Sequence, residues 1–129
     1  MELGTLFYGN GAGIHVDDRT LEHLRLAMAV RLRRSESFMV SLPVEELGAG
    51  SRRNLWVSPA VPLQFVSSGS RVPTLNRMWI QAMGESEDST GTLTVMPESE
   101  AVAYLERKHM RVMNQYAAES SHMGVRAAS

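Results

Sequence analysis

The side chains that could bind a metal ion or transfer a proton are few, and they lie near the start of the chain. His15, Asp17 and His23 form the densest group, and alternation along an extended segment would place His15 and Asp17 on one face. Asp17 also precedes a helical pattern, where its carboxylate suits the N-cap position. His23 has no evident partner. We therefore expect capping and surface roles for these residues, with no metal and no cofactor.

Other catalytic chemistries lack the residues they need. The chain has no cysteine, which excludes thiolate ligands and disulfides, and it has no G-x-S-x-G segment for a serine nucleophile. Gly9, Gly11 and Gly13 resemble a phosphate-binding loop, but that function uses a following helix, and here a strand-like segment follows. We expect a hairpin turn there and no catalytic residues. A small-molecule site or an enzyme using His15 and Asp17 is the least favoured interpretation.

Arginine supplies the positive charge in the middle of the chain. Residues 19–77 contain nine arginines and four glutamates, a net charge of +5 in a chain whose total is −1. Such a segment suits contact with nucleic acid or head-to-tail association with acidic flanks. The arginines that would form a nucleic-acid face are Arg31, Arg33, Arg34, Arg52, Arg53, Arg71 and Arg77. Arg31, Arg33 and Arg34 also suit the C-terminus of a helix, so pairing within the protein is the competing explanation.

The elements that must position these side chains follow an α+β pattern. Residues 4–9 and 13–17 alternate like a β-hairpin, and a helix with a buried stripe of Leu21, Leu24, Met28 and Leu32 follows. Leu26 and Val30 lie on the opposite side of that helix, so we expect this side to contact something too. Further strands are predicted at 37–42, 54–57, 63–66 and 92–96, with a loop at 45–53. A second helix is predicted to start at Thr74 or Pro73 and to end at Gly84, and its buried face holds Leu75, Met78, Trp79 and Ala82. The order ββαβββαβ predicts a mostly antiparallel sheet covered by two helices.

The last third of the chain carries the most regular pattern. After Pro97, the residues Val102, Leu105, His109, Val112 and Tyr116 recur at intervals of three and four. This spacing places them on one seam of an α-helix that docks on another helix, either in its own domain or in a partner chain. We expect a compact domain at 1–97, an amphipathic docking or oligomerisation helix at 98–119 and a flexible tail at 120–129.

Four runs of residues resemble a family of small actinobacterial proteins. The runs are Gly4–Gly9, Asp17–Phe38, Leu55–Phe65 and Leu75–Ile80, within a resemblance that covers residues 3–97. Members are mostly uncharacterised, and some carry the label ATP-dependent DNA ligase. The resemblance implies no known catalytic residues.

The ligase label conflicts with the position of the only lysine. Ligases of that kind transfer an adenylyl group through a lysine in a K-x-D/N-G setting, whereas Lys108 is followed by His109, Met110 and Arg111. We therefore do not expect a catalytic ligase. An accessory role near DNA repair stays open.

These observations favour a non-enzymatic protein-interaction module that self-associates through the C-terminal helix, with Leu26 and Val30 as further contact residues. The partner is a second copy or another protein. The alternative is a nucleic-acid-associated accessory protein that uses the arginine-rich face. No apolar run approaches the ~20 residues that span a bilayer. The first residues lack the layout of a signal peptide, so we expect no membrane contact and a cytoplasmic location.

Overall fold

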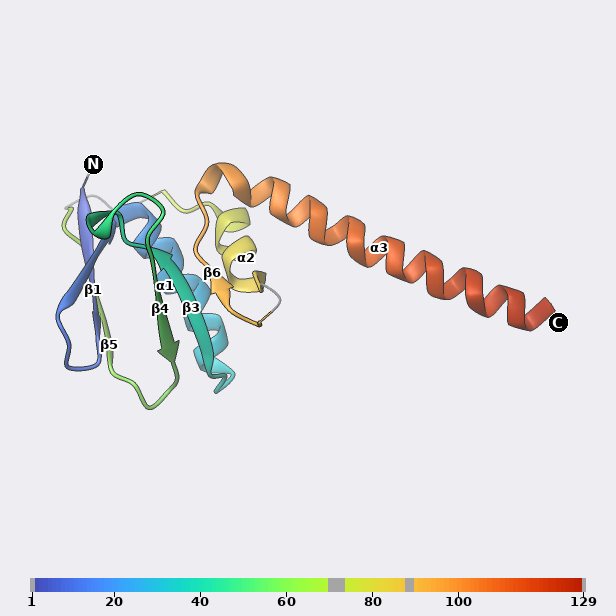
Figure 1. Ribbon diagram of the computed structural model, residues 1–129, viewed down its shortest axis with the longest axis horizontal. Helices are drawn as coiled ribbons and strands as arrows, with labels where there is room; N and C mark the ends of the chain where they lie inside the picture. The colour runs from blue at the N-terminus through green and yellow to red at the C-terminus, as the bar shows by residue number, and fades with distance from the viewer. Residues whose placement is uncertain (1, 70–73, 88–89, 129) are drawn as a thin grey trace.

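Two three-stranded sheets and two helices form a body from which a third, long helix projects (Figure 1). The computed structural model describes residues 2–69, 74–87 and 90–128. The first sheet has the order β2-β1-β5 and the second sheet the order β4-β3-β6. The strands are β1 (Leu3–Tyr8), β2 (Gly13–Asp17), β3 (Phe38–Pro43), β4 (Arg52–Val57), β5 (Leu63–Val66) and β6 (Leu93–Thr94). The helices are α1 (Asp18–Arg33), a short 3₁₀ turn η1 (Glu45–Leu47), α2 (Arg77–Glu85) and α3 (Glu98–Ala128).

The predicted α+β class is confirmed, although the strands divide into two sheets rather than one. The pairs β1–β2, β1–β5 and β3–β4 are antiparallel, whereas β3–β6 is parallel because the chain returns to β3 through α2. Between β4 and β5 the chain contains Pro59 and Pro62, which lack the N–H that a continuing ladder needs. The chain therefore changes sheets at this turn.

The first helix begins and packs as its sequence predicts. Asp17 is the N-cap, and its carboxylate accepts from the backbone N–H of Thr20 at 3.0 Å. Leu21, Leu24 and Met28 are buried against the inner faces of the strands, while Leu32 is only partly buried. The prediction of a buried stripe on α1 is therefore confirmed for its first three members.

The second helix begins later than predicted because Asn76 caps it. The Asn76 carboxamide oxygen accepts from the backbone N–H groups of Met78 and Trp79, at 3.0 and 3.3 Å. Trp79 and Ala82 are buried as expected, but Leu75 and Met78 are about half exposed, which corrects the predicted buried face. Leu75 precedes the cap and therefore cannot lie on the helix.

A buried histidine joins α1 to α2. His23 is fully buried, its Nδ1 lies 2.7 Å from the carbonyl oxygen of Arg19, and its Nε2 accepts from the backbone N–H of Asn76 at 2.8 Å. Because Nε2 accepts, Nδ1 carries the proton and the ring is neutral. The ring also contacts Trp79, with centroids 4.4 Å apart. The expected surface role of His23 is wrong, since its partner lies 53 residues away.

Asn76 extends this network to the start of α3. Its Nδ2 donates to Glu98 Oε2 at 2.8 Å, and Nη2 of Arg19 donates to the same oxygen at 2.8 Å. Nη1 of Arg19 pairs with the other oxygen of Glu98, and the guanidinium lies over the ring of Trp79. We call Arg19, His23, Asn76, Trp79 and Glu98 the anchor network. It holds α1, α2 and the base of α3 together.

The third helix and the shorter elements differ from their predicted bounds. α3 begins at Glu98 as expected but is helical to Ala128, beyond the predicted end at residue 119. β4 begins at Arg52, two residues early, and β6 contains only Leu93–Thr94. The bounds of the strands depend on which residues pair with a neighbouring strand, and the local sequence carries little information about that pairing.

Replacing Asn76 with alanine should destabilise the protein by about 1–3 kcal/mol, because the variant loses the cap of α2 and the bond to Glu98 together. Urea unfolding followed by circular dichroism measures the difference. Asn54→Ala is the matched control, since Asn54 is exposed on β4 and its side chain makes no hydrogen bond within the described residues; its effect should stay within about 0.5 kcal/mol. Equal losses in the two variants would contradict the role of Asn76.

Candidate interaction surface on the C-terminal helix

The first three turns of α3 are fixed to the body. Ala101 is fully buried, and Tyr104 and Leu105 pack partly buried against the core. The Tyr104 hydroxyl and the Lys108 ammonium both donate to the backbone carbonyl of Glu85, at 3.2 and 3.1 Å. These two bonds satisfy an orphan carbonyl at the C-terminus of α2. The only lysine of the chain therefore has a structural partner.

Between Lys108 and Ser120 the apolar side chains of α3 are exposed in the single chain. Val112 is 57% exposed and Tyr116 is 69% exposed, and Val102, nearer the body, is 44% exposed. His109 is exposed as well. Of the predicted seam, the body covers only Leu105 in part. Most of the seam is therefore uncovered by the protein's own core, and Figure 1 shows the helix leaving the body.

The geometry of the helix explains why the body does not cover the seam. A helix of 31 residues is about 46 Å long, and roughly the last 20 residues extend beyond Lys108. Viewed along the helix axis, the seam lies about a quarter of a turn from the side on which Ala101 and Tyr104 pack against the body. Leu105 belongs to both sides. Both the length and the rotation leave the seam open to a partner.

One exposed methionine, Met113, widens this surface, and the sequence analysis missed it. Its side chain is 52% exposed. Met113 follows Val112 and occupies the position that a wider apolar stripe adds to a strict three-four seam. A search for such a wider stripe would have found it. Methionine side chains are flexible and adapt to irregular partner surfaces.

A shallow groove of about 350 Å³ separates α2 from α3 beside the seam. It is lined by Gln81, Glu85, Leu105, Lys108, His109 and Val112. Three seam residues, Leu105, His109 and Val112, therefore line the α3 side of this groove. A partner helix on the seam would lie along this groove.

Leu26 and Val30 do not join the seam. Leu26 is partly buried, and Val30 is 42% exposed near the C-terminal end of α1. α3 is fixed at the other end of α1, where Arg19 pairs with Glu98. Arg19 and Val30 are 11 residues apart on α1, a distance of about 16 Å along the helix axis. The expectation that these two residues contact a partner stays a prediction, separate from the α3 surface.

Two of the arginines assigned to a nucleic-acid face have other partners. Arg31 is buried, donates to the carbonyls of Gly84 and Ser86 and lies over the ring of Phe38. Arg52 donates to Ser41 and to the carbonyl of Val95. Both side chains stabilise the fold, and Arg31 in particular is not available to a phosphate. This corrects its predicted role.

The other arginines do not share one face. Arg33 and Arg34 end α1, just before β3 begins, whereas Arg53 pairs across from Leu42 near the opposite end of β3. About 13 Å of strand separates these positions. Arg77 begins α2, and Arg71 lies outside the described residues. The structure thus scatters the positive charge that the sequence groups together.

Of the residues considered for a metal site, His23 is separated from His15 and Asp17, which line one pocket. The His15 side chain is exposed beside the hydroxyl of Thr5, Asp17 caps α1, and His23 lies in the anchor network. Within the described ranges, no three His, Asp or Glu residues lie close enough to hold a metal ion. Nor does any helix in that part of the chain have the length and apolar character needed to cross a bilayer.

Among the acids that the structure describes, Glu98 has the pKa that departs furthest from its ordinary value. The hydrogen bond from Arg19, and then the one from Asn76, lowers its pKa from an ordinary value of about 4.5 to about 2. The ionised form is thus the one that the fold stabilises. The base of α3 is fixed by a charge that persists over the whole neutral range.

Comparison with known proteins gives a family and no activity. A family model described as a domain of unknown function (DUF7882) matches residues 3–98. No curated protein and no solved structure matches the chain. The matched region ends where α3 begins, so the exposed seam lies outside it.

Acid should selectively weaken the contribution of Glu98 to stability. Its folded pKa lies below its unfolded pKa, so the contribution is fully present above about pH 4.5 and disappears as the pH falls toward about 2. Glu98→Gln cannot ionise and lacks this contribution at every pH. Urea midpoints of the two proteins should therefore differ at pH 6 and converge by pH 2. If the difference between the two urea midpoints stayed constant from pH 6 to pH 2, ionisation of Glu98 would not be its cause.

Proposed function

Since the chain belongs to this family, whose description assigns no activity, we propose its role from the geometry: a cytoplasmic, non-enzymatic interaction module that self-associates through α3. The observation that carries the proposal is the exposure of Val112 and Tyr116, with Met113 beside them, on a helix whose base is rigidly held. Apolar side chains repeated along one side of a projecting helix are typical of an interface.

The outer part of α3 needs a partner for its own stability. An isolated helix shorter than about 12–15 residues is marginal in water, and longer ones depend on packing of an apolar face. Past Lys108 the described side chains of α3 are exposed up to Ser120, so nothing in the single chain supplies that packing. Burial on a second helix would supply it, at about 25 cal/mol for each Å² of apolar surface removed from water.

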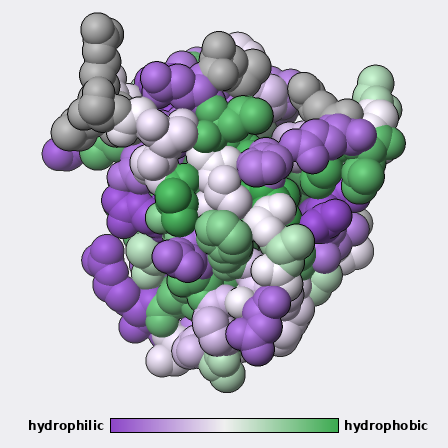
Figure 2. All heavy atoms as spheres, turned by 90° about the vertical axis from the view of Figure 1, so that its left-hand side faces the viewer, coloured by the Kyte–Doolittle hydropathy of each residue, from purple (hydrophilic) through white to green (hydrophobic). Residues whose placement is uncertain are grey.

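A second copy of the same chain is the partner that the seam fits best. The seam is apolar apart from His109, so two copies facing each other bury apolar side chains against apolar side chains, with no Asp, Glu, Lys or Arg among the five seam residues. The face of the body opposite α3 offers less: hydrophobic patches there are interspersed with hydrophilic side chains and do not form one apolar surface (Figure 2). Helix-to-helix contact is therefore favoured over contact between bodies.

Nucleic-acid association is the second candidate function. It is supported by the resemblance to actinobacterial proteins labelled as DNA ligases and by Arg33 and Arg34, which are exposed and make no ion pair within the described residues. An accessory protein near DNA repair would use them for phosphate contacts. The dispersal of the other arginines makes this candidate the weaker one.

Val112→Glu/Tyr116→Glu should convert the protein to a monomer, because each copy would place two carboxylates in the apolar contact. Asn114→Glu/Ala118→Glu is the matched control: it adds the same charge at the same spacing on the other side of α3, and it should leave the oligomer intact. Light scattering and sedimentation velocity at ~100 μM measure the mass against the 14.3 kDa of one chain. A wild-type monomer at that concentration would refute self-association.

Truncation provides a second test of the same surface. A chain ending at His109 keeps Glu98, Tyr104 and Lys108, so it should remain folded, and it should be monomeric because the outer seam is gone. A cut at residue 97 is less informative, because it also removes Glu98 from the anchor network. An oligomeric 1–109 chain would place the interface on the body instead.

The nucleic-acid candidate makes its own prediction. A DNA duplex should be shifted by the full chain at ~50 mM salt, much less at ~200 mM, and not by Arg33→Ala/Arg34→Ala. Arg107→Ala, which removes a charge from α3, is the control and should retain the shift. No shift at low salt would eliminate this candidate and leave the self-association proposal untouched.

A further inference from the structure

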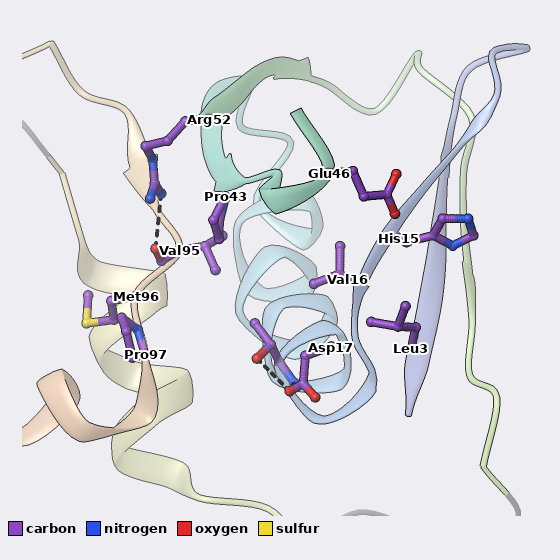
Figure 3. Close-up of a pocket in the computed structure, with 11 residues that line it drawn as sticks. Leu3, His15, Val16, Asp17, Pro43, Glu46, Arg52, Val95, Met96 and Pro97 are labelled. Carbon is purple, nitrogen blue, oxygen red and sulfur yellow. Dashed lines mark hydrogen bonds between the residues drawn. The ribbon is translucent and has the colours of Figure 1, made fainter. Parts of the chain in front are cut away.

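A pocket of about 730 Å³ opens between the end of the first sheet and the second sheet (Figure 3). Its volume lies within the range of pockets that hold small organic ligands, about 300–1,000 Å³. The apolar lining consists of Leu3, Val16, Pro43, Val95, Met96 and Pro97. The polar lining consists of His15, Asp17, Thr20, Glu46 and Arg52. The pocket is distinct from the α3 seam and shares no residue with it.

Arg52 brings a fixed and uncompensated positive charge to this pocket. Its Nε donates to Ser41 Oγ at 2.7 Å, and Nη2 donates to the carbonyls of Ser41 and Val95 at 2.8 and 3.1 Å. All three acceptors are neutral, and no carboxylate pairs with Arg52 in the part of the chain that the structure describes. Nη1 makes no hydrogen bond there. The guanidinium is therefore held in place with only the two N–H groups of Nη1 unused.

The free N–H groups of Nη1 are suited to a carboxylate oxygen. The planar guanidinium presents N–H groups in a geometry that matches carboxylate oxygens, and immobilisation by other bonds reduces the entropy lost on binding. The apolar residues Val95, Met96 and Pro97 lie on the same side of the pocket as Arg52 in Figure 3. An apolar body attached to the carboxylate would lie against them.

The other side of the pocket limits the ligand to a single acidic group. Figure 3 places His15 and Glu46 across the pocket from Arg52, and Asp17 lies at its lower end. Asp17 Oδ2 already accepts from the backbone and the hydroxyl of Thr20, while Oδ1 has no partner among the described residues. Two carboxylates would repel a second negative charge on the ligand. They would accept a hydroxyl or amine donor.

We propose that this pocket binds a small organic monocarboxylate with an apolar body, whose acid group pairs with Nη1 of Arg52. The apolar lining receives the body of the ligand, and Asp17 and Glu46 face its far end. Within this assignment Arg52 has two roles: it ties β4 to β3 and to the segment before α3, and it recognises the acid.

A pair of probes with the same apolar body tests the proposal on the wild-type full chain. 3-Phenylpropionate should shift the backbone amide signals of residues 15–17, 44–46, 52 and 95–96 in a ¹⁵N–¹H NMR titration, with a Kd of about 1–10 mM for so small a molecule. The neutral 3-phenylpropionamide should bind about tenfold more weakly. Equal effects of acid and amide, shifts located elsewhere, or no shift at ~10 mM acid would each overturn the proposal.

Variants locate the charge that the acid recognises. Arg52→Gln should remove the preference for the acid over the amide, whereas Arg53→Gln, which changes the charge equally at the neighbouring exposed position, should retain it. The ¹⁵N–¹H spectrum of the backbone N–H groups of Arg52→Gln, recorded without a probe molecule, shows whether β3 and β4 still pair. If that variant unfolds, the ratio of acid to amide affinity in the wild-type protein decides the question. Retention of the preference in folded Arg52→Gln would contradict the proposal.

Discussion

The contact of Glu98 with Arg19 and Asn76 is the constraint on which the arrangement of this protein depends. It joins three helices at one point: Arg19 comes from α1, Asn76 caps α2, and Glu98 begins α3. The ring of Trp79 lies under the guanidinium, and its indole N–H donates to the carbonyl of Met96 at 2.9 Å, just before α3. The direction in which α3 leaves the body is therefore determined by buried and charge-assisted bonds rather than by a loose linker.

That constraint has consequences along the whole of α3. Glu98 lies in the first turn, where a negative charge also interacts favourably with the helix dipole. Within the next three turns, Tyr104 and Lys108 close the end of α2, and after them the side chains of α3 are exposed as far as Ser120. A rigid base and an uncovered apolar seam are features of a presented surface. Val112 and Tyr116 are consequently held at a distance from the body, where a second copy has access to them.

How well the sequence predicted a feature depended on how far apart in the chain its interacting residues lie. The cap by Asp17, the stripe of α1 and the first hairpin are local, and spacing alone predicts them. His23, Arg31 and Arg52 have their partners 53, 53 and up to 43 residues away, respectively, and nothing in their neighbourhood distinguishes them from exposed residues of the same type. Arg52 and Arg53 are adjacent, yet only Arg52 lines the pocket between the sheets. The regular seam after Pro97 was visible in the sequence, but its exposure required the position of α3.

The central claim is that α3 of one copy lies against α3 of another, and a distance between two copies tests it most directly. The chain has no cysteine, so Ala117→Cys accepts a single spin label on the outer part of α3. Electron double-resonance at ~100 μM should then show a defined intermolecular distance of about 15–30 Å, because two paired helices keep this position within that range in either relative direction. A decay without dipolar modulation would show that the helices do not pair and would contradict the account.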